Sequence, residues 1–477
     1  MEERLNKLKR LRELQINPYP YRFDRSHNFA QIKENFEELS NSQTQVKTAG
    51  RIIAIRGHGQ TIFATLNDEN EKLQIYLRQQ DLGENFGLFE NFDIGDFIGL
   101  EGKVFKTKTG EITILVEKFI LLSKSLRPLP EKWHGLKDIE IRYRKRYLDL
   151  IANPKVKEIF KRRSVLISLL RNFFNEQEFL EVETPVLQPI YGGAAAKPFK
   201  TFYNALNQDM YLRIADELYL KRLIVGGYGK VWEFCKDFRN EGLDRFHNPE
   251  FAMIEAYQAY TDYQGIMALV ENLIEYLVKN LYPDNRITFQ DMSVEIKRPF
   301  KKLKYTEALN EKLGVDILKI TEKELNGLCE KHVIKTENQT IGYKIDKLFS
   351  EFIQKSLIEP TFVIDYPKVI SPLAKEHRNN PLLVERFELI IFGLEVTNAF
   401  TELNDPIEQR KRFERQLAQK EEGIGEIDED FLEALEYGMP PTGGLGIGVD
   451  RLCMILLNQP SIRDVILFPH MRKEDDR

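Results

Sequence analysis

Residues 232–257, WEFCKDFRNEGLDRFHNPEFAMIEAY, bring together the charged and aromatic side chains best suited to chemistry in this chain. Alternate residues of a β-strand share a face, so Arg239 and Glu241 are expected to point together at the end of one strand. After a loop that carries His247, one face of the next strand is expected to present Phe251, Met253, Glu255 and Tyr257. Gathering so many polar groups on one surface is costly unless that surface binds a charged molecule, although a salt-bridged core hairpin gives the same pattern.

The pattern Phe238-Arg239-x-Glu241, a loop, and then His247-x-x-x-Phe251 resembles the second signature motif of the class II aminoacyl-tRNA synthetases, which clamps ATP. Arginine is permanently charged and can fork onto the α-phosphate oxygens, where it stabilises the charge of an in-line displacement. His247 can reach the terminal phosphates, and Phe251 offers a face for adenine stacking. The resemblance implies a nucleotide site made by Arg239, Glu241, His247, Asn248, Phe251, Glu388, Glu395 and Arg451.

Two other segments resemble the remaining motifs of this family. Residues 157–190, a long helix followed by a strand ending at Pro185, resemble the first motif, which forms a dimer interface. Residues 440–451, PPTGGLGIGVDR, resemble the third motif, a glycine-rich strand–helix junction that ends in Arg451. Its glycines permit close approach of the backbone to nucleotide, or they serve close packing alone. The catalytic residues implied by the resemblance are Arg239, His247 and Arg451.

Longer segments resemble the bacterial class II lysyl-tRNA synthetases, and this similarity runs from about residue 46 to residue 472. They are IYGGAAAKPF (190–199), RIADELYLKRLIVGG (213–227), RNEG with HNPEF (239–251), LEVTNAFTELNDP (394–406) and IRDVILFPHMR (462–472). The resemblance implies a lysine–tRNA ligase whose partners are lysine, ATP and tRNA(Lys). The alternatives are an aspartyl- or asparaginyl-type class II synthetase, a paralogue that lysylates a protein, and a non-catalytic RNA-binding paralogue.

The acidic residues expected in the amino-acid-binding pocket agree with lysine as the substrate. A pocket lined by Glu217, Glu255, Glu402 and Tyr257 favours a cation, whereas an aspartate- or asparagine-activating relative would need a cation of its own there. By resemblance, Glu402 and Tyr257 would hold the ε-ammonium group of lysine. Glu217 and the Gly193 carbonyl would hold the α-ammonium group. Any one of these glutamates could instead be a solvated strand end.

The resemblance also assigns the rest of the pocket. Asn398 and Arg239 would hold the substrate carboxylate, and Glu255 and Phe400 would complete the walls. Asn398, Phe400 and Glu402 are spaced by two, so one face of a strand presents all three.

Glu388 and Glu395 form a further acidic pair on the apolar stretch FELIIFGLEV. Carboxylate oxygens together with phosphate oxygens suit Mg²⁺, and the two residues match the magnesium-binding glutamates of the family. A salt bridge to Arg451 is the alternative. No zinc site is expected, because Cys235, Cys329 and Cys453 are scattered and form no Cys-x-x-Cys.

The elements around these residues predict an α+β multidomain protein with an N-terminal OB-fold β-barrel. The resemblance implies that a class II catalytic domain follows it, built on an antiparallel sheet flanked by helices. Five β-rich runs between residues 46 and 122 alternate with turn residues and predict the barrel. In the family this barrel reads the anticodon, since single-stranded RNA is read by stacking and base-edge hydrogen bonds. The corresponding residues are Arg51, Phe63, Gln74 and Glu111, although each could be an ordinary barrel residue.

The expected segments are an N-terminal helical segment at 1–45, the barrel at 46–124, a linker at 125–142 and the catalytic domain at 143–477, with a partly helical insertion around 285–380. Helices are expected at 4–16, 157–177, 261–280 and within 305–357, and strands are expected at 179–187 and to dominate 208–260 and 385–403. The helix at 157–177 should bury one face, made of Val165, Leu166, Leu169, Leu170 and Phe173. The basic helix at 4–16 either docks by its leucine stripe or lies along a phosphate backbone.

Composition excludes several classes of protein. With 42% hydrophobic and 30% charged residues among 477, the chain is neither wholly disordered nor collagen-like. A net charge of −5 is too near balance for a generic DNA coat, so DNA is not an expected partner. No apolar run is long enough for a membrane span, and we expect a soluble cytoplasmic protein. The resemblance of residues 157–190 to the first motif implies a homodimer.

The sequence departs from the family pattern at three places. Asp216 stands where proline is common, and Lys197 replaces a frequent arginine. In the loop, Arg245 and then Phe246 precede His247, which leaves the γ-phosphate contacts open.

Overall fold

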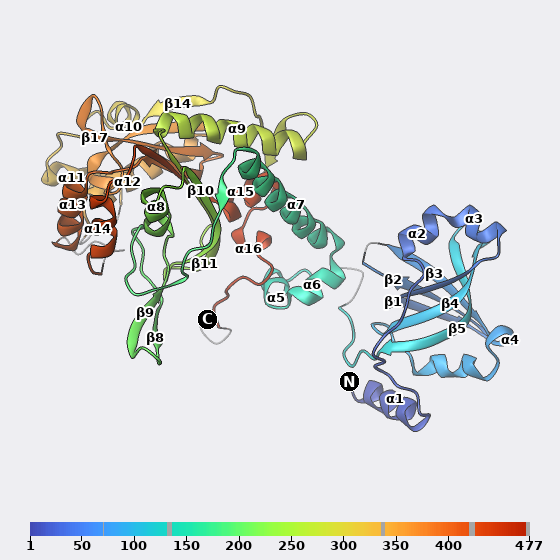
Figure 1. Ribbon diagram of the computed structural model, residues 1–477. Coiled ribbons are helices and arrows are strands. Elements are labelled where there is room, and N and C mark those ends of the chain that lie inside the picture. Colours follow the sequence, from blue (N-terminus) through green and yellow to red (C-terminus); the bar gives the residue numbers. More distant parts are fainter. Residues whose placement is uncertain (70, 131–135, 335–338, 419–424, 474–477) are drawn as a thin grey trace. The chain divides into compact units, whose positions relative to one another are not determined.

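The computed structural model describes residues 1–69, 71–130, 136–334, 339–418 and 425–473. The chain divides into two compact units, Met1–Leu136 and Lys137–Arg477 (Figure 1). Within the described residues, no helix has the length and apolar character needed to cross a membrane.

The first unit contains a closed barrel in the order β1-β2-β3-β5-β4. Its strands are β1 (Gln45–His58), β2 (Thr61–Asn67), β3 (Lys72–Arg78), β4 (Phe97–Lys106) and β5 (Ile112–Ser123). Only the β3–β5 pair is parallel. The five predicted runs are confirmed as strands of one barrel, because their alternating apolar residues fill its interior.

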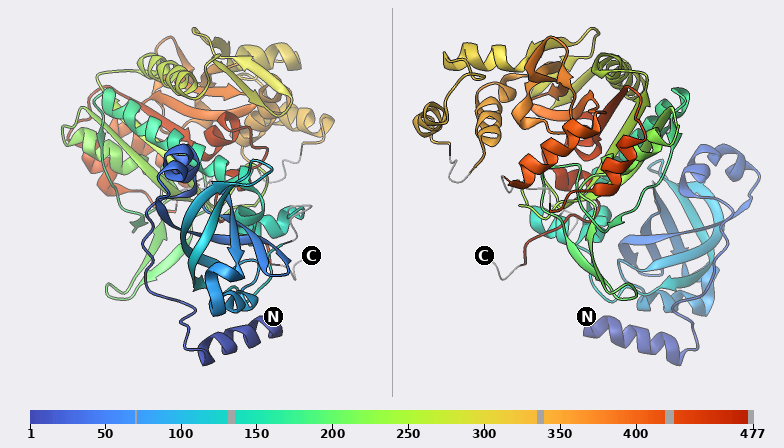
Figure 2. Two further views of the ribbon diagram at one scale, coloured as in Figure 1. Left: turned by 90° about the vertical axis from the view of Figure 1, so that its right-hand side faces the viewer. Right: turned by 60° about the vertical axis from the view of Figure 1, so that its left-hand side comes forward.

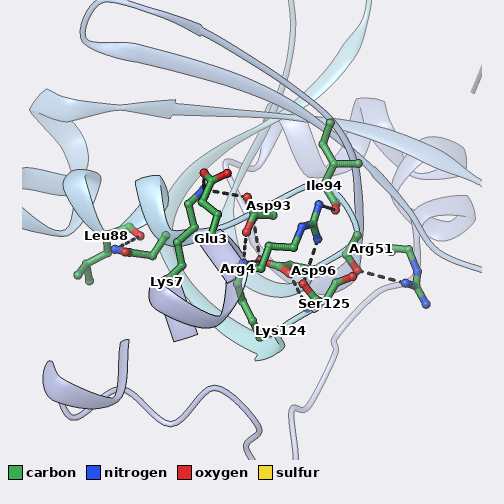
Figure 3. Close-up of polar contacts among 12 residues, drawn as sticks. Glu3, Arg4, Lys7, Arg51, Leu88, Asp93, Ile94, Asp96, Lys124 and Ser125 are labelled. Atoms are coloured by element: carbon green, nitrogen blue, oxygen red, sulfur yellow. Dashed lines mark hydrogen bonds and ion pairs between the residues drawn. The ribbon is translucent and has the colours of Figure 1, made fainter. Parts of the chain in front are cut away.

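Short helices complete the first unit. They are α1 (Glu2–Glu13), α2 (Phe29–Glu34), α3 (Phe36–Asn41), α4 (Gln79–Leu82) and the 3₁₀ helix η1 (Gly83–Asn91). In α1, Leu8 and Leu11 are buried, while Leu5 is exposed. The Arg4 guanidinium donates to the carbonyl of Ile94 at 2.9 Å, and Lys7 binds Asp93 at 2.8 Å (Figure 3). The docked interpretation of this helix is therefore confirmed; contact with a phosphate backbone stays a prediction.

A nine-stranded sheet, counted over the described residues, forms the centre of the second unit in the order β14-β15-β17-β18-β19-β11-β10-β6, with β16 paired to β17. Its strands are β6 (Leu180–Glu181), β10 (Lys230–Phe238), β11 (Glu250–Ala259), β14 (Lys301–Lys304), β15 (Thr361–Pro367), β16 (Glu376–His377), β17 (Asn380–Ile391), β18 (Leu394–Thr401) and β19 (Thr442–Gly448). The central pairs are antiparallel, as predicted. Two small sheets lie beside it, made of β7 (Leu187–Gln188), β8 (Lys200–Tyr203) and β9 (Gln208–Leu212), and of β12 (Arg286–Phe289) and β13 (Met292–Glu295).

Helices cover both faces of this sheet (Figures 1 and 2). One face packs on α7 (Pro154–Glu176), α9 (Tyr263–Leu281) and α15 (Val449–Leu456), which share a large apolar core with it. The other face packs on α8 (Glu217–Val225), α10 (Tyr305–Leu313), α11 (Glu322–Lys331), α12 (Ile341–Phe352), α13 (Pro406–Ala418) and α14 (Glu429–Glu436). The remaining helices are α5 (Ile139–Arg144), α6 (Arg146–Ala152), α16 (Ile462–Val465), η2 (Gln354–Ser356) and η3 (Lys368–Ile370).

The alternation of side chains along the strands decides which residues reach the site. Ala256 of β11, Ala399 of β18 and Leu445 of β19 join the core on the α7 side. Their neighbours Tyr257 and Phe400 pack on the opposite side, against α8 and its neighbouring helices. The predicted functional face therefore lies on the side of the sheet that α8 covers.

Several sequence predictions need correction. The strand predicted up to Pro185 is reduced to β6 and, beyond the proline, β7, since proline cannot donate to a ladder. The α8 helix interrupts the region expected to be dominated by strands at 208–260. Val165 of α7 is 51% exposed, although it was expected on the buried face with Leu166. The predicted linker falls partly on residues 131–135, which lie outside the described residues, and α5 begins within its range.

Candidate active site

The residues of the predicted acidic pocket form a buried cluster on β11, β18, β19 and α8. Glu255 and Tyr257 share one face of β11, and the Tyr257 hydroxyl donates to Glu255 Oε2 at 2.9 Å. Glu402 directly follows β18, and its backbone N–H donates to the Thr442 carbonyl at 2.8 Å. Glu217 is the first residue of α8. All four predicted acidic and phenolic side chains are buried and converge, so none of them is a solvated strand end.

Lys221 links two of these carboxylates. It lies one helical turn after Glu217, and its ammonium group donates to Glu217 Oε1 at 2.5 Å and forms an ion pair with Glu402 Oε2. Its side chain has no exposed surface. Sequence reasoning missed this residue, because a Glu–Lys pair spaced by four is also what an exposed helix face shows.

Burial dominates the protonation of the pocket. Burial raises the pKa of Glu402 to about 8, although the ammonium group of Lys221 lowers it in part. Burial, followed by the charges of Asp216 and Glu217, raises the pKa of Glu255 well above its usual range. Desolvation opposes the charge of Lys221, but Glu217 and Glu402 outweigh it and raise the pKa of Lys221. The pocket therefore holds more acid than one internal cation neutralises.

Glycines give these side chains room. A Cβ atom on Gly444 would overlap Glu402 Oε1 and lie 2.7 Å from Tyr257 Cε1. The close-packing interpretation is thus confirmed at Gly444. Gly193 has a φ of +87°, and a Cβ there would lie 3.4 Å from the Cβ of Glu217. The structure therefore places Gly193 beside Glu217, as the resemblance implied.

Arg239 lies just outside the strand in which it was expected. The β10 strand ends at Phe238, and Arg239 and the exposed Glu241 follow it in a loop. The backbone N–H of Arg239 donates to the Pro249 carbonyl at 2.8 Å. Its guanidinium group lies 5.0 Å from the centre of the Phe251 ring. Arg239 and Phe251 are therefore adjacent, as predicted. The loop after β10, and not the strand itself, positions the arginine.

His247 lies between an acid and an arginine. Its Nδ1 lies 2.7 Å from Asp244 Oδ2, and its Nε2 lies 3.2 Å from Arg451 Nη2. An arginine can only donate hydrogen bonds, so Nε2 of His247 is the acceptor. Nδ1 therefore carries the ring proton and donates a hydrogen bond to Asp244. Asp244 also accepts the backbone N–H groups of Phe246 and His247, at 2.6 and 2.8 Å. Sequence reasoning missed Asp244. It lies in the loop that departs from the family pattern, three residues before His247, and that position could have drawn attention to it.

Asn248 holds the same loop to its surroundings. Its side chain is buried, and its Nδ2 donates to the Glu250 carbonyl at 2.6 Å. Its Oδ1 accepts from the His470 backbone N–H at 3.3 Å. The structure thus gives Asn248 a local structural role, and its contact with ATP stays a prediction.

Glu388 and Glu395 lie on neighbouring strands, and each binds an arginine. The predicted alternative is present for Glu395, whose Oε2 accepts from Arg451 at 3.0 Å. Glu388 Oε1 accepts from Arg386 at 2.7 Å. Burial, and then the charge of Glu395, raises the pKa of Glu388 to about 7. Two carboxylates that repel each other, each with a second oxygen, fit a divalent cation.

Arg386 also orients Asn398. Its Nε donates to Asn398 Oδ1 at 2.9 Å. The asparagine oxygen is thereby occupied, so its amide N–H groups are the ones available to a substrate carboxylate. Arg386 was missed in the sequence, although it shares a strand face with Glu388.

Asp216, the departure from the family pattern, lies in a second acidic cluster. Donor atoms of Asp216, Cys235 and Asp237 lie within 4.8 Å of one another, and all three side chains are buried. Burial and the charge of Asp237 raise the pKa of Asp216 well above its usual range. All three cysteines are free and buried, so the chain has no disulfide.

Three of the four predicted anticodon residues come together on the barrel. Phe63 stacks on Tyr76 with ring centres 4.3 Å apart. Gln74 Oε1 accepts from Thr113 at 2.9 Å, and Thr113 lies two residues after Glu111.

Arg51 is separate from these three. On β1, the residue paired with Phe63 is Arg56, and Arg51 lies five residues before it. Five residues of a strand span about 16 Å. The Arg51 guanidinium group is 4.2 Å from the Phe97 ring centre and donates to the Gly95 carbonyl at 3.1 Å.

Comparison with known proteins agrees with this geometry. The family model described as "tRNA synthetases class II (D, K and N)" matches residues 138–472, and the model described as "OB-fold nucleic acid binding domain" matches residues 46–122. A lysine–tRNA ligase of Carboxydothermus hydrogenoformans is 51% identical, covering 99% of this chain and 98% of that protein. Lysine–tRNA ligases of Fervidobacterium nodosum and Methanoculleus marisnigri are 50% and 49% identical, covering 100% and 98% of this chain and 94% of each relative.

The chain belongs to the lysine–tRNA ligase family. The predicted fold, an OB-fold barrel followed by a class II synthetase domain, is confirmed. Membership distinguishes the chain from the aspartyl and asparaginyl enzymes that share its family model. Lysine carries two ammonium groups, and the buried carboxylates around Lys221 are of the opposite charge.

Proposed function

We propose that the chain activates lysine with ATP to give lysyl-adenylate and pyrophosphate, and then transfers the lysyl group to tRNA(Lys). The observation that carries this proposal is the convergence of three buried glutamates on one side of the central sheet. An uncompensated buried carboxylate is costly, so a pocket that keeps three of them is suited to a cationic ligand.

Each end of the substrate has a group of matching charge. Glu402 and Tyr257 would receive the ε-ammonium group, and Glu217 with the Gly193 carbonyl would receive the α-ammonium group. The support is that Glu402 and Tyr257 both lie over Gly444, while Gly193 lies beside Glu217.

The carboxylate end of lysine would lie toward the nucleotide. There the N–H groups of Asn398 and the guanidinium group of Arg239 would bind it, and Glu255 and Phe400 would form the walls. Arg386 supports this role of Asn398, because it occupies the asparagine oxygen.

The activation step needs positioning and charge stabilisation rather than a covalent nucleophile. A carboxylate oxygen of lysine forms a bond to the α-phosphorus of ATP. The bond from that phosphorus to the oxygen bridging to the β-phosphorus breaks, and pyrophosphate leaves with the electron pair. Arg239 and Arg451 would stabilise the charge that develops, and His247 would orient Arg451, which it contacts.

In the transfer step, a hydroxyl oxygen of the terminal adenosine of tRNA attacks the lysyl carbonyl carbon. The bond to the adenylate oxygen breaks, AMP leaves, and the hydroxyl proton is lost. The ester that forms carries lysine on the tRNA. Phe63, Gln74 and Glu111 would contact the anticodon at the same time, and their grouping on one part of the barrel supports this role. Arg51, whose charge is directed to Phe97, would act apart from them.

Glu388 and Glu395 would hold Mg²⁺. The ion would neutralise charge on the phosphate oxygens of ATP and so make the α-phosphorus easier to attack. The two glutamates fit this task, because each keeps one oxygen beyond its arginine contact. We propose no zinc cofactor.

We also propose a homodimer formed through residues 157–190 in the cytoplasm. Val165, Leu180, Val186 and Leu187 of this segment are exposed apolar side chains, and exposed apolar side chains on one segment suit an interface. Light scattering should give twice the chain mass. Val165→Glu should lower that mass if the segment is the interface.

An amino-acid-dependent ATP–pyrophosphate exchange assay tests the proposed function. We expect exchange with lysine and none above background with aspartate or asparagine. Exchange with aspartate or asparagine instead would identify another member of the subclass, and no exchange with any amino acid would identify a non-catalytic paralogue.

A further inference from the structure

Lys221 lies among the proposed substrate contacts without being one of them. Its ammonium group bridges Glu217 Oε1, at 2.5 Å, and Glu402 Oε2. It lies 5.6 Å from the centre of the Phe400 ring. An ammonium group with no exposed surface is costly to bury, and it is retained here between the two carboxylates proposed to bind the substrate's two ammonium groups.

The charges of the pocket match a substrate that brings two cations. Among the described residues, Lys221 is the cation that forms ion pairs with Glu217 and Glu402, so its single positive charge answers two carboxylates, and Glu255 has no ion pair. Lysine carries two ammonium groups, whereas most amino acids carry one. A substrate with a single ammonium group would leave one buried charge without a partner.

Lys221 leaves room for that substrate. A carboxylate offers two oxygens and about four lone-pair sites. Lys221 contacts Oε1 of Glu217 and Oε2 of Glu402, and the other Glu402 oxygen lies beside Gly444. Each glutamate can therefore accept a second ammonium group while Lys221 stays in place.

We propose that Lys221 is a positioning residue for lysine recognition: its ammonium group fixes Glu217 and Glu402 at a set separation, so that each accepts one ammonium group of the substrate. This inference rests on the proposed function and deepens it. Lys221 itself touches no reacting atom.

The groups that face this pair define its pH dependence. Glu402 faces Lys221, Glu217 and Tyr257, and Glu217 also faces Arg386. Burial raises the pKa of Glu402 and Lys221 lowers it, so removing the ammonium group should raise that pKa further. A lysine pocket without Lys221 should therefore bind its substrate only at higher pH.

The test compares Lys221→Met with wild type in ATP–pyrophosphate exchange across the range from about pH 6.5 to 9. We expect the KM for lysine to rise at least about tenfold at neutral pH, with a KM for ATP within about twofold of wild type. We also expect the pH at which the lysine KM reaches its minimum to move up by about one unit.

A matched control is Lys344→Met on α12. Lys344 is also a buried lysine in an ion pair, at 3.4 Å from Glu322, but it lies outside the pocket. Its substitution should leave the lysine KM and its pH profile unchanged. If Lys344→Met changed them as much as Lys221→Met, the effect would be general destabilisation and the proposal would be overturned.

Two further variants cover the case in which Lys221→Met does not fold. Lys221→Gln keeps a hydrogen-bond donor but loses the charge, and should shift the pH profile. Lys221→Arg keeps the charge and should retain the wild-type profile. A lysine KM that is unchanged or lower in Lys221→Met or Lys221→Gln would overturn the proposal. It would also be overturned if Lys221→Arg folded and both uncharged variants failed to fold, because Lys221 would then be needed for folding.

The same assay separates the two proposals. No lysine-dependent exchange in wild type would refute the proposed function itself. Normal exchange in wild type together with an unaffected Lys221→Met would refute only the role of Lys221.

Discussion

Gly444 and Glu402 are so close that a Cβ atom on the glycine would overlap the carboxylate oxygen Oε1 of the glutamate. The glycine belongs to the segment that resembles a nucleotide-binding motif, yet its missing Cβ leaves space for two side chains of the proposed amino-acid pocket. The same missing Cβ admits the Tyr257 ring. The segment that resembles the third motif therefore contributes to both halves of the proposed site, since its strand carries Gly444 and the helix after it carries Arg451.

Gly444→Ala should impair lysine recognition more than ATP recognition. The new methyl group would displace Glu402 and Tyr257, so we expect the lysine KM to rise about tenfold or more, while the ATP KM changes by less than about threefold. Exchange kinetics with each substrate varied in turn measure both. Gly327→Ala on α11 is the control, because its Cβ would meet no heavy atom within 4 Å. An equal change in both KM values would contradict the account.

Lysine binding should strengthen as the pH rises. Burial raises the pKa of Glu402 to about 8, so this carboxyl is mostly protonated at neutral pH in the free enzyme. Only the ionised form pairs with an ammonium group, so the lysine KM should fall up to about tenfold between about pH 7 and 8.5. Calorimetry in buffers of different ionisation enthalpy should detect release of a proton when lysine binds. A pH-independent KM in wild type would refute this assignment.

The raised pKa of Glu402 should affect stability in the opposite direction: as the pH rises, lysine binding should strengthen while the free energy of unfolding falls. A buried carboxyl whose folded-state pKa is raised stabilises the fold when protonated, and this contribution is lost between about pH 4.3 and the folded-state pKa. Without lysine, wild type should therefore lose thermal stability relative to Glu402→Gln as the pH approaches about 8. Unfolding temperatures of both proteins at several pH values check this, and parallel curves would count against it.

Asp244→Ala should weaken ATP use while sparing lysine binding. Asp244 fixes His247 by its ring nitrogen and by its backbone N–H, and His247 in turn contacts Arg451. We expect the ATP KM to rise about tenfold and the lysine KM to stay near wild type. Asp244→Asn keeps an oxygen for the backbone N–H groups and should have a smaller effect. If both substitutions were silent, Asp244 would have no part in holding the nucleotide loop.

Phe63→Ala should separate the two steps of the reaction. Its ring stacks on Tyr76 on the barrel, and base stacking is worth about 1–3 kcal/mol per base. Pyrophosphate exchange should be unchanged, whereas the KM for tRNA(Lys) in charging should rise about tenfold or more. Tyr21→Ala is the control, since Tyr21 is a fully exposed aromatic residue of the same unit. Equal loss in both reactions would argue against anticodon recognition.

Much of the fold could be predicted from local sequence pattern. The barrel strands and α9 show regular alternation or helical spacing, because each buries one face against a core. The segment after α7 was harder to predict, since Pro185 divides it and leaves β6 and β7 with two residues each. Val165 fits the helical spacing, but spacing cannot tell a core face from a face available to a partner.

The acidic pocket could be predicted because Glu402 and Tyr257 sit at positions that match a family motif. The residues that pair with the predicted site residues could not be predicted, because the pairs form only through tertiary contacts. Lys221 meets Glu402, and His247 meets Arg451 across 204 residues of sequence. Nothing local distinguishes such residues from surface charges, and only the assembled sheet shows that they are buried or paired.

The most direct test of the acidic lysine pocket is ATP–pyrophosphate exchange by Glu402→Gln, with lysine and ATP varied separately. Glutamine keeps the shape of the side chain but cannot pair with the ε-ammonium group. We predict a lysine KM raised by a factor on the order of 10² and an ATP KM within about threefold of wild type. A lysine KM near the wild-type value would contradict the account.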